Sequence, residues 1–124
     1  MLFDFQRRMG GASDLDGVPR VMGGISQTGP GWLAGQLEKP DHGLRVIDVR
    51  EPYEYEAGHI EGAELVPLGS LIQAASTWDR DPPLVMVCRS GARSARATMA
   101  LMQMGFATVH NLQGGMIGWS RIAP

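Results

Sequence analysis

The sequence predicts an α/β fold in three layers, with a central parallel sheet of about five strands and helices on both faces. Two observations carry this prediction. From residue 44 onward, short apolar segments rich in β-branched residues alternate with segments of helical pattern, and no repeat or low-complexity tract interrupts the alternation. Such alternation favours parallel strands, because each helix returns the chain to the same edge of the sheet.

Four apolar segments have the length and composition of strands, and they span residues 44–49, 64–66, 84–88 and 108–112. Helices are expected over residues 52–57, 68–75, 93–104 and 116–119. Pro52 suits a first helical position, where the N–H that proline lacks would have no partner. Gly105 is a typical residue for the end of the third of these helices.

The first 43 residues give a weaker pattern. Residues 1–24 contain many glycines and little periodicity, so we expect an irregular N-terminal extension with a short edge strand near residues 21–25. Pro30 favours a helix that reaches Leu37, although the glycines around it weaken that helix. The domain proper is therefore expected over residues 25–124.

Length and composition indicate one globular domain without a cofactor. The 124 residues are 44% hydrophobic and carry a formal net charge of −2, which argues against a nucleic-acid-binding surface. One cysteine and three scattered histidines form no metal-ligand pattern. No stretch approaches the ~18 apolar residues of a membrane span, and the N-terminus lacks the apolar core of an export signal. A cytoplasmic location without membrane partners follows by default.

Cys88 is the only cysteine and opens the sequence CRSGARS at residues 88–94. This segment joins a buried strand to a helix, so successive backbone N–H groups and the positive helix end can surround an anion there. With Arg89 and Arg93 nearby, these surroundings should lower the thiol pKa from roughly 8.5 toward neutrality and make Cys88 nucleophilic.

An inert core residue is the alternative interpretation of a lone cysteine. Three neighbours argue against it. Gly91 lets the backbone approach a ligand closely, and the hydroxyls of Ser90 and Ser94 can donate hydrogen bonds to an anion.

Three separated segments of the chain resemble the signatures of the rhodanese family of sulfurtransferases. They are VIDVREP at residues 46–52 with YEY at 53–55 and GHIEGA at 58–63, CRSGARS at 88–94, and LQGGM at 112–116 followed by Trp119. The resemblance implies a rhodanese-like domain that moves a sulfane sulfur from thiosulfate or a persulfide donor to a thiophilic acceptor such as cyanide, a thiol or a protein. Cys88 would carry the sulfur as a persulfide. Donor and persulfide would be bound by the rest of the loop: Arg89, Ser90, Gly91, Ala92, Arg93 and Ser94.

Loop length separates two related chemistries. Four residues lie between Cys88 and Arg93, whereas cysteine phosphatases that resemble this fold have a loop one residue longer, wide enough for a phosphate group. The shorter loop favours a sulfane sulfur over an arsenate reductase or phosphatase activity. A regulatory binding module without turnover is a further alternative, which loss of the cysteine would support.

Asp48 and Arg50 lie at the carboxyl end of the strand over residues 44–49, where open α/β sheets place their binding crevices. They are supporting residues with two open interpretations: contact with the substrate, or a structural role in which Asp48 braces the loop and Arg50 pairs at its rim. Arg93 also has a structural alternative, an ion pair with Asp48.

Three further predictions concern packing and partners. Met99, Met102 and Met104, with Leu101, have the spacing of a buried helix face, and His59 and Trp119 are expected to be structural. Because the chain has a single thiol, the sulfur must leave to another molecule. Small sulfur donors and acceptors, thioredoxin, glutathione or a sulfur-carrier protein fit as partners in sulfur metabolism.

Overall fold

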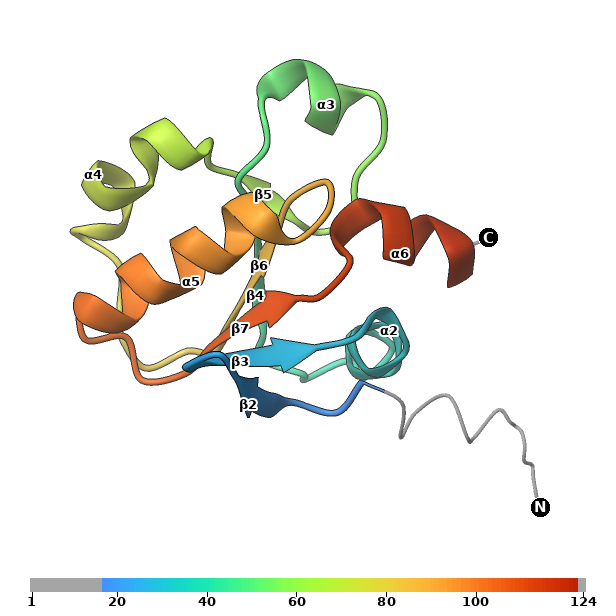
Figure 1. The fold of residues 1–124 in the computed structure, drawn as a ribbon, viewed down its shortest axis with the longest axis horizontal. Helices are drawn as coiled ribbons and strands as arrows, with labels where there is room; N and C mark the ends of the chain where they lie inside the picture. Colours follow the sequence, from blue (N-terminus) through green and yellow to red (C-terminus); the bar gives the residue numbers. More distant parts are fainter. Residues whose placement is uncertain (1–16, 123–124) are drawn as a thin grey trace.

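The computed structural model describes residues 17–122, which form one six-stranded sheet between two layers of helices (Figure 1). The strand order is β2-β3-β7-β6-β4-β5, and only β2 runs antiparallel to its neighbour. The expected sheet of five parallel strands is thus confirmed, with β2 added at one edge. The strands are β2 (Arg20–Met22), β3 (Ile25–Thr28), β4 (Arg45–Asp48), β5 (Glu64–Leu65), β6 (Leu84–Val87) and β7 (Val109–Leu112).

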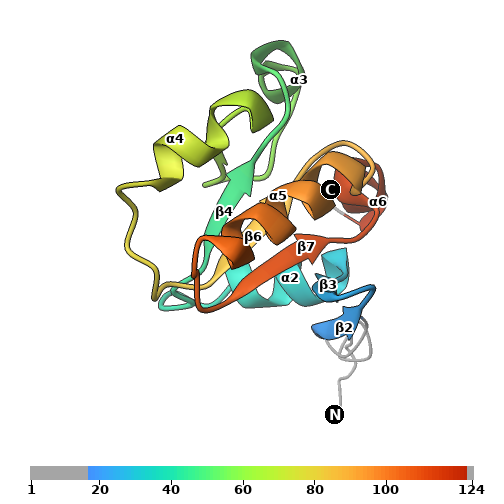
Figure 2. The same cartoon turned by 60° about the vertical axis from the view of Figure 1, so that its left-hand side comes forward.

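Helices cover both faces of the sheet. They are α2 (Pro30–Leu37), α3 (Pro52–Glu56), α4 (Leu71–Ala75) after a 3₁₀ turn η1 (Leu68–Ser70), α5 (Ala92–Gln103) and α6 (Gly115–Ile122). One apolar core joins the sheet to α4 and α5, and a second joins it to α2 and α6. Figure 2 shows β4 pointing toward α3, which follows its carboxyl end. Within residues 17–122, no helix is both long and apolar enough to span a bilayer.

The strands alternate between these two cores, as the period of two requires. In β4 and beyond, Ile47 and Val49 face the α4 and α5 side, whereas Val46 faces the α2 and α6 side. All four residues of β6 are buried because the central strand is covered on both faces.

The N-terminal part of the fold is more regular than the sequence suggested. The first sixteen residues of the expected extension over residues 1–24 lie outside the described residues, and β2 occupies part of the remainder. The edge strand expected near residues 21–25 is a hairpin of β2 and β3, because Gly23 and Gly24 adopt positive φ angles of 65° and 85° and turn the chain. Helix α2 forms despite its glycines, with Pro30 in its first turn and Leu33 fully buried.

The prediction that Met99 and Met102 belong to the core is wrong. Both are exposed, at 45% and 43%, whereas Met104 is partly buried against the core. The buried face of α5 instead carries small and short side chains at helical spacing: Ser94, Ala97, Thr98 and Leu101. The two methionines lie outside this buried face, because α5 packs on the sheet with one face only.

The start of α6 fixes the loop that follows β6. The backbone N–H of Met116 donates to the carbonyl of Cys88 at 2.8 Å, and that of Ile117 donates to the carbonyl of Arg89 at 3.0 Å. This contact requires Gly115, which has a φ of 53°, because an added Cβ would collide with the carbonyl of Cys88 and lie 2.6 Å from that of Arg89. The start of α6 therefore holds the loop that follows β6 through backbone hydrogen bonds.

Substitution of Gly115 by alanine is expected to destabilise the domain. The positive φ and the backbone collision together should cost ~2 kcal/mol or more, which lowers the melting temperature by roughly 8 °C. Circular dichroism during heating measures this change. Gly69→Ala is the control, since Gly69 has no atom within 4 Å of an added Cβ. Equal melting temperatures of the two variants would contradict a requirement for glycine at position 115.

Candidate active site

Cys88 directly follows β6, beside the carboxyl end of β4. In the parallel register Asp48 is paired with Val87, so the segments that leave these two strands start side by side. Residues 48–50 and 88–94, far apart in the sequence, are thereby brought to one edge of the sheet. Helix α5 then begins at Ala92, with Gly91 as its N-cap.

The sulfur of Cys88 accepts two hydrogen bonds from its own loop. The backbone N–H of Gly91 donates to Sγ at 3.0 Å, and the hydroxyl of Ser94 donates to it at 3.3 Å. The residue is fully buried. Burial opposes ionisation and is the largest single influence on the Cys88 pKa, but the Ser94 hydroxyl and the backbone N–H groups of Ser94, Gly91 and Ser90 outweigh it, so the pKa lies below its ordinary value. This environment stabilises a thiolate.

Asn111 holds the same loop from β7, and sequence reasoning did not assign it a role. Its Nδ2 donates to the carbonyl of Gly91 at 3.2 Å and to Oε1 of Gln27 at 2.9 Å. Gly91 has a φ of 103°, and its carbonyl also accepts from the N–H of Ala95 in α5. Asn111 thus fixes the peptide that follows the Gly91 donor. The signal in the sequence was the pair of polar residues His110 and Asn111 within a strand that begins with Val109 and ends with Leu112.

Arg93 binds the carboxylate of Glu54, a residue of the first sequence signature to which no role had been assigned. Its two terminal nitrogens donate to the two carboxylate oxygens of Glu54, both at 2.9 Å. The alternative partner Asp48 is therefore wrong, because Glu54 in α3 reaches over the loop and Asp48 is already engaged. The hydrogen bonds from Arg93 lower the pKa of Glu54 to about 2, and Glu54 together with the nearby Cys88 raises the pKa of Arg93.

Asp48 and Arg50 form a buried pair of their own. Nε of Arg50 donates to Oδ1 of Asp48 at 2.9 Å, and Nη2 donates to Oδ2 at 2.7 Å. Nη2 also donates to the carbonyl of Gly58 at 2.9 Å. Asp48 therefore orients Arg50 rather than the Cys88 loop, and Arg50 ties the end of β4 to the segment after α3.

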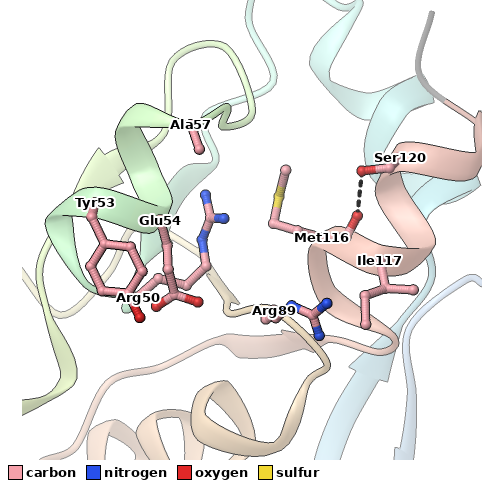
Figure 3. Close-up of a pocket in the computed structure, with 8 residues that line it drawn as sticks. All are labelled: Arg50, Tyr53, Glu54, Ala57, Arg89, Met116, Ile117 and Ser120. Atoms are coloured by element: carbon pink, nitrogen blue, oxygen red, sulfur yellow. Dashed lines mark hydrogen bonds between the residues drawn. The ribbon is translucent and has the colours of Figure 1, made fainter.

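A pocket of about 360 Å³ lies beside the loop. Figure 3 shows its lining side chains, which come from α3 and the residues that flank it on one side and from α6 on the other, with Arg89 between them. Arg89 is exposed, and within residues 17–122 it pairs with no carboxylate. The lining residues are Arg50, Tyr53, Glu54, Ala57, Arg89, Met116, Ile117 and Ser120.

The remaining predicted loop residues contribute backbone rather than side chains. Ser90 and Ala92 are exposed, and the Ser90 contribution to the sulfur is its N–H. The two residues that were expected to be structural, His59 and Trp119, both pack against other side chains. His59 stacks on Tyr55 with ring centroids 3.6 Å apart, and Trp119 packs against the core on the α2 and α6 side.

Comparison with known proteins identifies the family. The family model of the rhodanese-like domain matches residues 29–122 of the chain. This chain belongs to the rhodanese-like family. The resemblance inferred from the three sequence segments is thereby confirmed, together with the three-layer fold.

Two curated relatives and one solved structure illustrate the similarity. The uncharacterized protein YqhL of Bacillus subtilis is 41% identical over 75 residues, which cover 60% of this chain and 60% of YqhL. The thiosulfate sulfurtransferase GlpE of Pseudomonas paraeruginosa is 36% identical over 84 residues, which cover 68% of this chain and 76% of GlpE. The rhodanese-like domain of the Alr3790 protein from Anabaena sp. is 28% identical with a TM-score of 0.73, covering 78% of this chain and 74% of that one. The chain thus spans less than two thirds of YqhL and about three quarters of the other two proteins.

Removal of the Ser94 hydroxyl is expected to raise the pKa of Cys88. A hydrogen bond to a charged group contributes about 1.5 kcal/mol or more, so Ser94→Ala should shift the pKa upward by about one unit. The pH dependence of alkylation by iodoacetamide measures this shift, because only the thiolate reacts. Ser90→Ala is the matched control, since it keeps the backbone donor; an alkylation midpoint that is the same in both variants would contradict a role for the Ser94 hydroxyl.

Proposed function

We propose that this rhodanese-like domain transfers a sulfane sulfur through a persulfide on Cys88. The observation that carries the proposal is the pair of donors on the Cys88 sulfur, the N–H of Gly91 and the hydroxyl of Ser94. A persulfide is anionic, as the thiolate is, so the donors that lower the Cys88 pKa also suit the intermediate.

The first half of the reaction loads the cysteine. The thiolate of Cys88 attacks the outer sulfur of the donor, and the S–S bond of the donor breaks. Its electron pair leaves with sulfite when the donor is thiosulfate, or with a thiolate when the donor is a persulfide. In the second half, an acceptor such as cyanide or a thiolate attacks the outer sulfur of Cys88-S-S⁻ and restores the thiolate. Two-step covalent transfer of this kind predicts ping-pong kinetics.

The arginines of the site divide into two groups in this proposal. Arg50 and Arg93 are each engaged by a carboxylate, which supports structural roles in holding α3 and the loop. Arg89 is exposed beside the pocket, and we assign it to the anionic end of the donor, because a guanidinium offers several N–H donors to an oxyanion. The acceptors thioredoxin, glutathione and a sulfur-carrier protein, and the cytoplasmic location, stay predictions.

Intact-mass analysis after incubation with thiosulfate tests the reaction directly. The native protein should gain one sulfur atom, and cyanide should remove it with formation of thiocyanate. Cys88→Ser should gain nothing, because its hydroxyl is not a thiolate. A gain in both proteins would contradict the Cys88 persulfide, and a gain in neither would favour a regulatory binding module.

Neutralisation of Arg89 should weaken donor binding without unfolding the domain. For Arg89→Gln, loss of one charge-assisted contact of about 1.4 kcal/mol corresponds to a tenfold higher KM for thiosulfate. Initial rates of thiocyanate formation give KM, and thermal unfolding should be unchanged within a degree or two. Arg96→Gln, which removes an exposed arginine from α5 outside this pocket, is the charge-matched control; an equal rise of KM in both variants would show a general charge effect and overturn the assignment.

A further inference from the structure

One buried polar atom beside the Cys88 loop lacks a hydrogen-bond partner. It is Oδ1 of Asn111, a residue that is only 2% exposed. Within residues 17–122, no other buried side-chain nitrogen or oxygen is left without a partner. An unpaired buried acceptor costs free energy, so other contacts of Asn111 must hold its amide in this orientation.

Two acceptors hold the Asn111 amide. Its Nδ2 donates to the carbonyl of Gly91 at 3.2 Å and to Oε1 of Gln27 at 2.9 Å. A carbonyl oxygen can only accept, so the end of the amide that faces Gly91 has to be the NH₂ group. Rotation of the amide by half a turn would bring Oδ1 against that carbonyl. Gln27 supplies the second hydrogen bond that opposes this rotation, and without it only the bond to Gly91 would remain.

Gly91 connects Asn111 to the sulfur of Cys88. The carbonyl of Gly91 accepts from Asn111 and from the N–H of Ala95, and its own N–H donates to Sγ at 3.0 Å. Gly91 has a φ of 103°, in a region where glycine has wide conformational freedom. Restraints on its carbonyl therefore also restrain the direction in which its N–H points.

Gln27 lies outside the residues that the family model matches. The match covers residues 29–122, whereas Gln27 belongs to β3. In the parallel register of β3 and β7, Gln27 is paired with Asn111, so their side chains lie on the same face of the sheet. The contact of Gln27 thus comes from the hairpin of β2 and β3, and the family resemblance assigns it no role.

We propose that Gln27 is a positioning residue for the Cys88 sulfur and that it acts through Asn111 and the backbone of Gly91. This inference rests on the proposed function, because the same sulfur would carry the persulfide. Loss of the acceptor at Gln27 weakens the hold on the Asn111 amide, and the N–H of Gly91 is then less well aligned with Sγ. The thiolate loses part of its stabilisation, so the pKa of Cys88 rises.

A pH titration followed by the ultraviolet absorbance of the thiolate tests this proposal without a reagent that has to reach the buried sulfur. Cys88→Ser gives the blank. Gln27→Met keeps a side chain of similar length but removes the acceptor, and methionine suits the position because Met22 and Met99 line the same cavity as Gln27. Gln27→Met should raise the pKa of Cys88 by about half a unit, less than the loss of a direct donor would.

Gln113→Met is the matched control, because Gln113 is an exposed glutamine that lines a second cavity together with Gln27. It should leave the pKa of Cys88 at its native value. Neither substitution changes a charge, so the ion pairs of Arg50 and Arg93 beside the loop stay as they are. Equal pKa values in the two variants would overturn the inference.

A double variant tests whether Gln27 acts through Asn111. Asn111→Leu removes the donor to Gly91 and should raise the pKa at least as much as Gln27→Met does. In that background Gln27→Met should have no further effect, because the link is already broken. Shifts that add in the double variant would overturn the route through Asn111. If Asn111→Leu does not fold, the comparison of Gln27→Met with Gln113→Met decides.

The melting temperature separates positioning from a purely structural role. A Gln27→Met protein that melts at a lower temperature but keeps the native pKa of Cys88 overturns the inference. Failure of the proposed function gives a different result, because the titration needs no sulfur transfer. A protein that titrates as expected but gains no sulfur from thiosulfate contradicts only the proposed sulfur transfer.

Discussion

The hydrogen bond from the Gly91 N–H to the Cys88 sulfur is the interaction on which the arrangement of the site depends. It requires a positive φ at Gly91 and a loop that closes tightly before α5. Three parts of the fold meet there: β6 delivers the cysteine, the start of α6 binds the carbonyls of Cys88 and Arg89, and Asn111 of β7 binds the carbonyl of Gly91. The donor geometry is therefore maintained by the sheet and two helices rather than by the seven loop residues alone.

Burial and ionisation act in opposite directions at this sulfur. Removal from water disfavours the thiolate, yet the same removal strengthens each remaining hydrogen bond, because fewer water dipoles compete with it. Nearby carboxylates would be expected to oppose a buried anion, but Asp48 and Glu54 are each paired with an arginine. Since the pKa of Glu54 is lowered in the folded chain, its contribution to stability is present above its unfolded pKa of about 4.5 and is lost as the pH falls toward 2.

Sequence patterns predicted what depends on neighbours along the chain. Local features predicted the helix layers and the parallel sheet. These features are the alternation of strands and helices, the strand before Cys88 and the helix after it. Pairings across the fold were not accessible in this way. Arg93 and Glu54 are 39 residues apart, and nothing in the sequence distinguishes Glu54 from Asp48 as the carboxylate that reaches the loop. Asn111 and Gly91 are likewise brought together only by the register of β7 beside β6. The exposure of Met99 and Met102 depends on which side of α5 meets the sheet, which an apolar count does not specify.

The groups that stabilise the Cys88 sulfur differ from the groups that line the pocket. This difference determines which substitutions can change the specificity of the site. The charge on sulfur is stabilised by the Ser94 hydroxyl and by three main-chain N–H groups, and almost any residue can supply the main-chain groups provided that the glycine conformation is kept. In the proposed sulfur transfer, the charge offered to the donor comes from the side chain of Arg89, and the apolar side chains of the pocket come from α3, its C-cap Ala57 and α6. Under the proposed function, substitutions in α3 can therefore alter the preferred donor while the hydrogen bonds to the Cys88 sulfur stay in place, because none of their donors lies in that helix.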